Sequence, residues 1–190
     1  MLSSNIRVWI FLACSISVFA RFFDGECQNP SLQPDFTLDN YLGLWYMYYA
    51  DPQTPFQENG NCGTAHYSPL DDTYINVFNA QIINGAKVAA AGRAYCEGSQ
   101  CYVSFFADFF GDYRVVSTDF ETYSIVYSCS RGGDNHRELL WILSRYRVLP
   151  IEDLEKIRKI IEVELPNWEW WMLTPAKHDY RCDYEGNIPS

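Results

Sequence analysis

The feature that most constrains the fold of this chain is a series of short stretches in which apolar and polar side chains alternate. Alternation with a period of two residues is typical of β-strands, where successive side chains point to opposite faces of a sheet. Aromatic residues, which favour strands, make up 17% of the sequence. We expect eight strands, covering residues 43–49, 63–68, 73–81, 87–95, 102–108, 113–117, 122–129 and 138–144.

Turn-forming residues separate these predicted strands. Asn84-Gly85, Gly98-Ser99 and Gly132-Gly133-Asp134 are examples. Short strands at even spacing predict an all-β chain with one antiparallel sheet. The pattern alone leaves open whether that sheet closes as a barrel or folds as a sandwich.

One amphipathic helix is expected near the end of the chain, beginning at Pro150. Glu152 and Asp153 suit the positive N-terminus of a helix. Charged residues follow one side, and the apolar stripe consists of Ile151, Leu154, Ile157, Ile160 and Ile161. Through this stripe the helix should pack on the outside of the sheet.

Residues 1–20 have the features of an export signal. Arg7 precedes an apolar run from Val8 to Ala20 that ends in small residues. The run is shorter than the 20 or so residues that span a bilayer, and no later stretch is apolar enough to do so. We therefore expect a secreted protein in which residues 21–190 form a single domain.

The expected mature chain is acidic. The formal net charge is −10, and removal of residues 1–20, which contain Arg7 and no acidic residue, makes it −11. Such a surface repels nucleic acid and anionic lipid, so neither is expected as a partner.

The cysteines indicate disulfide bonds. The sequence has seven cysteines, and Cys14 lies in the expected signal, which leaves an even number in the mature chain. Cys96 and Cys101 enclose only a turn-like tetrapeptide, so we expect them to be joined. Spacing leaves the other pairings open. No metal site is expected, because no Cys-x-x-Cys occurs and the histidines are scattered.

Three segments resemble the motifs of the lipocalin family. Leu42-Gly43-Leu44-Trp45-Tyr46 is similar to the Gly-x-Trp motif, and the segment from Ser117 to Tyr123, with Thr118 and Asp119, is similar to the Thr-Asp-Tyr motif. Leu140-Trp141-Ile142-Leu143-Ser144-Arg145 resembles the third motif. The order and spacing agree, and the resemblance is greatest to the branch of apolipoprotein D, insect bilin-binding protein and crustacyanin. Phe120 departs from the usual tyrosine.

The resemblance implies an eight-stranded up-and-down barrel with one helix packed outside. Trp45 would close the narrow end, and Arg145 would lie across its ring in a structural contact that does not touch ligand. It also implies the disulfides Cys27–Cys129 and Cys62–Cys182, which leaves the pair Cys96–Cys101. Gly43, Thr118 and Asp119 would be structural motif residues.

The walls of the ligand pocket follow from two lines of reasoning. If Trp45 and Arg145 point inward, alternation places further inward positions on the same two strands: Met47, Tyr49, Leu143, Trp141 and Leu139. The resemblance adds Tyr67 and Asn79 and reaches Trp141 again. The expected ligand-binding residues are therefore Trp141, Asn79, Tyr67, Met47, Tyr49, Leu139 and Tyr123.

Other features suggest how the pocket is shaped. Residues 88–92 are unusually small, which either widens the pocket or lets the helix pack closely against them. Arg93 and Arg114 would reach an acidic ligand near the mouth, or would be solvated. The loop from Asp51 to Asn61, with Pro55 and Phe56, is a candidate lid.

The leading functional interpretation is a carrier of a small hydrophobic ligand, most simply a pigment such as a bilin, a carotenoid or a retinoid. No cofactor would be required beyond such a bound chromophore. A sterol or fatty-acid carrier is the alternative within this class, and a ligand isomerase on the same scaffold is the alternative outside it. An enzyme is not expected, because there is no nucleophile–base pair and no Gly-x-Ser-x-Gly.

Self-association is a further hypothesis. Trp168, Trp170 and Trp171, with Tyr46 and Tyr48, would form an outer apolar patch for a homo- or hetero-oligomer.

Overall fold

The computed structural model describes residues 22–54, 57 and 60–185, so the expected signal at residues 1–20 lies outside the described residues. The helical elements are α1 (Leu38–Tyr41), α2 (Ile151–Glu164) and the 3₁₀ turn η1 (Trp170–Met172). The strands are β1 (Phe23–Asp24), β2 (Gly43–Ala50), β3 (Asn61–Pro69), β4 (Ile75–Ile83), β5 (Ala86–Glu97), β6 (Gln100–Phe106), β7 (Phe109–Thr118), β8 (Tyr123–Gly132), β9 (Asn135–Ser144) and β10 (Thr174–Pro175).

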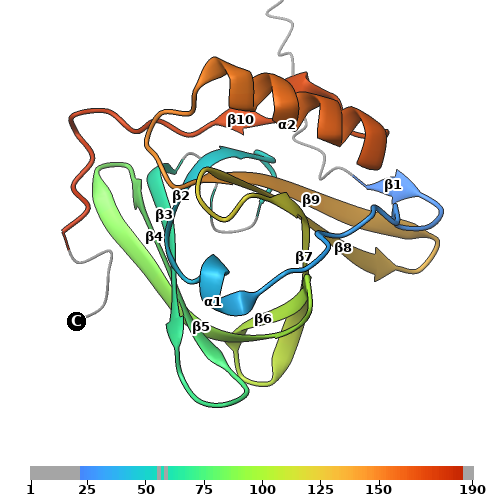
Figure 1. Ribbon diagram of the computed structural model, residues 1–190, viewed down its shortest axis with the longest axis horizontal. Coiled ribbons are helices and arrows are strands. Elements are labelled where there is room, and N and C mark those ends of the chain that lie inside the picture. Colours follow the sequence, from blue (N-terminus) through green and yellow to red (C-terminus); the bar gives the residue numbers. More distant parts are fainter. Residues whose placement is uncertain (1–21, 55–56, 58–59, 186–190) are drawn as a thin grey trace, which may run out of the picture.

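The sheet closes on itself as a barrel. Strands β2 to β9 follow one another around the sheet, each antiparallel to the next, and β9 pairs with β2 to complete the ring. Figure 1 shows this ring with α2 and β10 on its outer side and β1 beside β9. The predicted all-β barrel is confirmed, and the sandwich alternative is wrong because the first and last long strands are hydrogen-bonded to each other.

The barrel has a closed end and an open end. The chain enters through α1, whose Tyr41 is 2% exposed, and Trp45 of β2 is completely buried beside it. The described residues of the loop after β2 (51–54, 57 and 60) and the short β8–β9 turn lie at the opposite end. No helix in the described ranges is long and apolar enough to cross a membrane.

A second apolar cluster lies between the barrel and α2. Ile157 and Ile161 are buried against the outer face of β8 and β9, and Ile151 is 67% exposed. The expected helix and its packing are therefore confirmed, with an apolar stripe that begins after the first turn. Trp168 belongs to this cluster and is 3% exposed, so it cannot form part of the surface patch expected for self-association.

The position of Tyr49 differs from the expectation. The register between β2 and β9 shifts between Met47 and Tyr49, which marks a β-bulge. The extra residue reverses the alternation, so Met47 and Ala50 lie in the inner cluster and Tyr49 packs with the outer one. The Tyr49 ring lies 4.7 Å from that of Trp170. The prediction that Tyr49 lines the ligand pocket is therefore wrong.

Tyr123 also lies outside the barrel. Val126 of β8 is opposite Trp141 and faces inward, so Tyr123, three residues earlier, faces outward. It is 2% exposed, and the Nζ atom of Lys156 from α2 lies 4.7 Å from its ring centroid. Its assignment as a ligand-binding residue is wrong for this reason.

The three disulfides are those that the lipocalin resemblance implies. Cys27–Cys129 and Cys62–Cys182 fasten the two tails of the chain to the barrel. Cys96–Cys101 joins β5 to β6 next to their turn.

The small residues of β5 lie away from α2, which packs on β8 and β9. The alternative in which the helix packs closely against residues 88–92 is therefore wrong. On the inner face, a Cβ atom at Gly92 would come within 2.8 Å of the Phe105 ring. The same Cβ atom would come even closer to the carbonyl oxygen of Ser104, so the small size of Gly92 lets the backbone of β6 and the Phe105 ring approach β5. Ala90, on the same face and nearer the open end, is exposed.

Candidate ligand-binding site inside the barrel

The base of the barrel is closed by Trp45 and Arg145. The Cζ atom of Arg145 lies 3.7 Å from the centroid of the Trp45 ring, a cation–π contact. The guanidinium donates hydrogen bonds to the carbonyl oxygens of Leu44, Leu42 and Phe120. These carbonyls fix Arg145 beneath the indole, so its role is structural, as expected.

The other motif residues support this base. Gly43 has a φ of +94°, and a Cβ there would lie 3.4 Å from Arg145 Nη1. Asp119 Oδ1 accepts hydrogen bonds from the backbone N–H groups of Thr122 and Tyr123. Thr118 Oγ1 donates to the carbonyl oxygen of Tyr123. The hydrogen bonds of Thr118 and Asp119 hold the β7–β8 turn closed.

The remaining predicted wall residues lie on the inner face of the barrel. Met47 and Tyr67 belong to the inner cluster, at 7% and 5% exposure, and Trp141 packs against it. Asn79 is opposite Ala65, an inner residue, and Leu139 shares the face of Trp141 by strand alternation. The structure thus brings five of the predicted residues to one surface, and their contact with a ligand stays a prediction.

A chain of hydroxyl groups forms the polar floor above Trp45. Tyr67 Oη lies 2.9 Å from Tyr113 Oη, which lies 3.0 Å from Tyr41 Oη, which in turn lies 2.9 Å from Ser124 Oγ. Sequence reasoning missed Tyr113, Tyr41 and Ser124. For Tyr113 the reason is a β-bulge between Val115 and Ser117, which interrupts the alternation between Tyr113 and the motif at the end of β7.

The floor stays uncharged near neutral pH. Burial raises the pKa of Tyr41 to about 12, and burial raises the pKa values of Tyr67 and Tyr113 further. Phenols that keep their protons make a neutral, hydrogen-bonding surface.

Solvent reaches the inner wall toward the open end. Val88 of β5 is opposite Gln81 on the inner face and is 44% exposed. Trp141 is half-buried, and its indole Nε1 donates to Gln57 Oε1, 3.0 Å away in the loop after β2. This loop therefore contacts the wall at the mouth. Pro55 and Phe56 of the expected lid lie outside the described residues.

The two arginines expected near an acidic ligand lie on the outer face. Arg93 pairs with Asp108 at 2.7 Å and Arg114 with Asp112 at 3.0 Å. Arg114 lies beyond the reach of the interior because it alternates with Tyr113, which faces inward. Each already has an acidic partner, so this expectation is wrong.

Arg137 is an inward-facing arginine that the sequence reasoning missed. It alternates with Glu138, which is buried in the outer wall, and shares the face of Leu139 and Trp141. The count by twos that leads from Arg145 to Leu139 continues to Arg137, so the signal was present in the sequence.

One cluster has the residue types of a metal site. Atoms of Cys129, His136 and Glu138 lie within 4.8 Å of one another. Cys129 is joined to Cys27, so its sulfur is no thiolate, and the Glu138 carboxylate accepts hydrogen bonds from Gln28 and Trp168. These contacts explain the cluster as a support of the outer wall.

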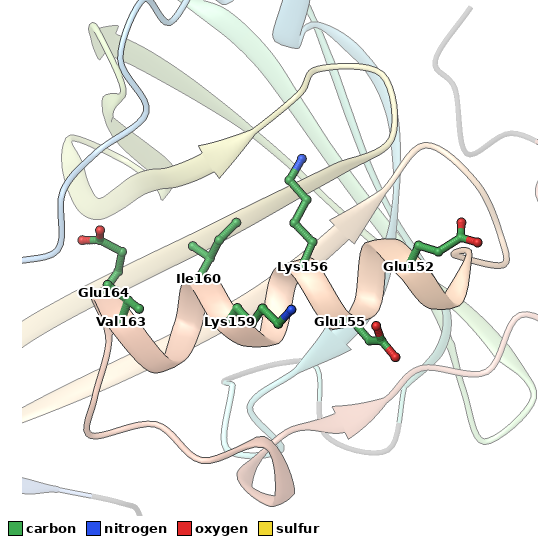
Figure 2. Close-up of a pocket in the computed structure, with 7 residues that line it drawn as sticks. All are labelled: Glu152, Glu155, Lys156, Lys159, Ile160, Val163 and Glu164. Carbon is green, nitrogen blue, oxygen red and sulfur yellow. The ribbon is translucent and has the colours of Figure 1, made fainter.

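A surface groove of about 500 Å³ runs along α2. Figure 2 shows that its lining side chains all come from this one helix, and they are Glu152, Glu155, Lys156, Lys159, Ile160, Val163 and Glu164. Its charges are mixed and it lies outside the barrel wall. The inner face of the barrel is therefore the better candidate site.

The residues of the barrel interior are suited to binding a small molecule. All six cysteines of the described chain are in disulfides, so they supply no thiol for an isomerase. The inner wall combines apolar side chains with a few polar groups, which is the composition typical of small-molecule sites.

Known proteins are similar to this chain in sequence and in fold. A family model described as a lipocalin-like domain matches residues 36–170. Apolipoprotein D from Mus musculus is 30% identical over 168 residues, which cover 82% of this chain and 88% of that protein. Among solved structures, insecticyanin from the tobacco hornworm Manduca sexta has a TM-score of 0.74 at 22% identity, covering 85% of this chain and 90% of its own. Lobster apocrustacyanin A1 has a TM-score of 0.75 at 20% identity, covering 86% and 94%.

Proposed function

Since the chain belongs to the lipocalin family, we propose that it is a secreted carrier that holds a small, mostly apolar ligand inside its barrel. We further propose that the ligand is a pigment of the bilin, carotenoid or retinoid type. The observation that carries the proposal is the inner wall, where apolar residues such as Val88 and Trp141 face inward and remain accessible near the open end. A filled core would exclude solvent from such side chains.

Asn79 favours a ligand with polar groups. Its Oδ1 atom is buried and has no hydrogen-bond partner in the described part of the chain. An unpaired buried acceptor costs free energy, so a ligand N–H or O–H group opposite Asn79 would be stabilising. The pyrrole N–H groups of a bilin supply such donors, whereas a hydrocarbon chain does not.

The resemblance to the branch of bilin-binding protein and crustacyanin also favours a pigment. Protein purified from its native source should show a visible absorption band that is lost on denaturation. A colourless protein from which lipid is extracted would contradict the pigment and favour the sterol or fatty-acid alternative.

The location of the site is testable with a pair of neighbouring residues. Ala90 faces the interior opposite Asn79, and Ala91, opposite Phe78, faces outward; both are exposed. Ala90→Trp should weaken ligand binding about tenfold or more by filling the mouth, and Ala91→Trp should leave it unchanged. Fluorescence titration with the extracted ligand measures both. Equal affinities in the two variants would place the ligand elsewhere.

A further inference from the structure

Arg137 gives the inner wall of this acidic protein a positive charge. The formal net charge of the chain is −10. Among the described inner-face positions of β2 to β9 above the base, Arg137 is the charged side chain, and no carboxylate faces it there. Arg137 is half-buried and lies opposite Ser130 of β8, which carries no charge. A half-buried cation gains from an anionic or polar partner that offsets its desolvation.

The protein satisfies Arg137 only in part. Its Nη2 atom donates to the carbonyl oxygen of Gln53, in the loop after β2 at the open end. Its Nε atom is buried and has no hydrogen-bond partner within the described ranges. An arginine offers five donors in a planar fork that matches a carboxylate. The described residues therefore leave the guanidinium of Arg137, beside the loop at the open end, with a donor that they do not satisfy.

Three other arginines that the sequence singled out are engaged away from the barrel interior. Arg145 lies under Trp45, and carbonyl oxygens accept its hydrogen bonds. Arg93 pairs with Asp108 and Arg114 with Asp112, both on the outer wall. The floor consists of the neutral phenols of Tyr41, Tyr67 and Tyr113. A charged group on the ligand would thus be stabilised at the mouth and disfavoured at the base.

We propose that the ligand is an apolar acid that enters with its apolar end first and pairs its carboxylate with Arg137 at the mouth. This rests on the proposed carrier function and adds the charge class of the ligand and the residue that selects it. An ionised carboxylate gains a charge-assisted hydrogen bond there, which an alcohol of the same shape does not.

The test compares retinoic acid with retinol, which share a hydrocarbon skeleton and differ in the polar end. Quenching of tryptophan fluorescence near neutral pH gives both dissociation constants. The wild-type protein should bind retinoic acid about tenfold more tightly than retinol. Arg137→Gln should remove this preference by weakening only the acid, and Arg137→Lys, which keeps the charge, should retain most of it.

Arg93→Gln is the matched control, because Arg93 lies on the outer wall and pairs with Asp108. It should leave both dissociation constants unchanged. If Arg137 only anchors the loop at Gln53, Arg137→Gln will change both ligands by the same factor, and that result overturns the proposal. An equal or greater affinity of the wild type for retinol does so as well.

Displacement of the apolar dye N-phenylnaphthylamine separates this proposal from the carrier function. If the dye and retinol bind and the acid is not preferred, only the role of Arg137 is wrong. If neither dye nor retinoid binds, the carrier function and the charge class fail together.

Discussion

At the scale of single residues, Glu138 in the outer wall of β9 is a buried carboxylate with several hydrogen-bond partners. It is completely buried, and its carboxylate accepts hydrogen bonds from Gln28 Nε2 at 2.7 Å and Trp168 Nε1 at 2.9 Å. His136 Nε2 lies 3.0 Å from its other oxygen. Glu138 thus joins the N-terminal segment, the last long strand and the segment after α2.

Glu138→Gln should lower the free energy of unfolding by about 2–4 kcal/mol, because an amide N–H₂ replaces an acceptor that faces buried donors. Urea denaturation monitored by fluorescence measures the change. Glu162→Gln, on the exposed side of α2, is the control and should stay within about 0.5 kcal/mol of the wild type. Equal losses in the two variants would contradict the role of Glu138.

A second residue-scale prediction concerns pH. Burial lowers the pKa of His178, whose Nε2 lies 2.8 Å from the carbonyl oxygen of Met47 and holds the C-terminal tail against β2. Below the unfolded value of about 6.5 the unfolded chain binds a proton that the folded chain does not, so stability falls as the pH falls. Above that value His178 contributes no pH dependence.

Urea midpoints at about pH 7.5 and about pH 5.5 test this, in the wild type and in His178→Gln. The decrease in stability should be smaller in the variant. His66, whose pKa burial also lowers, is present in both proteins and cancels in the comparison. The same decrease in both would show that His178 is not responsible.

At the scale of elements, strand alternation correctly predicted most of the inner-wall residues of the barrel. It failed where a β-bulge interrupts the alternation. On β9, which is regular, counting from Arg145 places Leu143, Trp141 and Leu139 correctly. On β2 the bulge after Met47 reverses the face of Tyr49, and no sequence signal marks it. The fold could be predicted because many strands and three motifs agree, whereas the floor depends on contacts between strands that are distant in sequence.

Tyr49→Ala tests the reversed face of β2. The variant should lose about 1–3 kcal/mol of stability, because the ring packs on Trp170 in the outer cluster. Its ligand affinity should match that of the wild type, as measured by the same fluorescence titration. A loss of affinity without a loss of stability would place Tyr49 in the pocket after all.

At the scale of the whole molecule, the disulfides differ in the length of chain that they close. Cys27–Cys129 and Cys62–Cys182 span 102 and 120 residues, and Cys96–Cys101 spans 5. Closing a longer loop removes more conformational entropy from the unfolded chain. The two long-range bonds should therefore contribute most to the free energy of unfolding, and they should keep the two tails attached to the barrel.

Replacing both cysteines of each pair with serine should show this ranking. The Cys62/Cys182 variant should lose about 4–5 kcal/mol and the Cys96/Cys101 variant about 2 kcal/mol by the loop-entropy relation. Thermal and urea denaturation of the two variants provide the measurement. A greater loss from the short hairpin bond would contradict the loop-length argument.

The same separations have a consequence for biosynthesis. A ribosome that adds about 5–20 residues per second needs roughly 6–24 s to make the 120 residues between Cys62 and Cys182. Throughout that interval Cys62 lacks the partner that it has in the finished barrel, and Cys27 lacks Cys129 for the first part of it. A thiol that waits so long meets other cysteines first, so a disulfide isomerase should speed the oxidative refolding of the reduced protein.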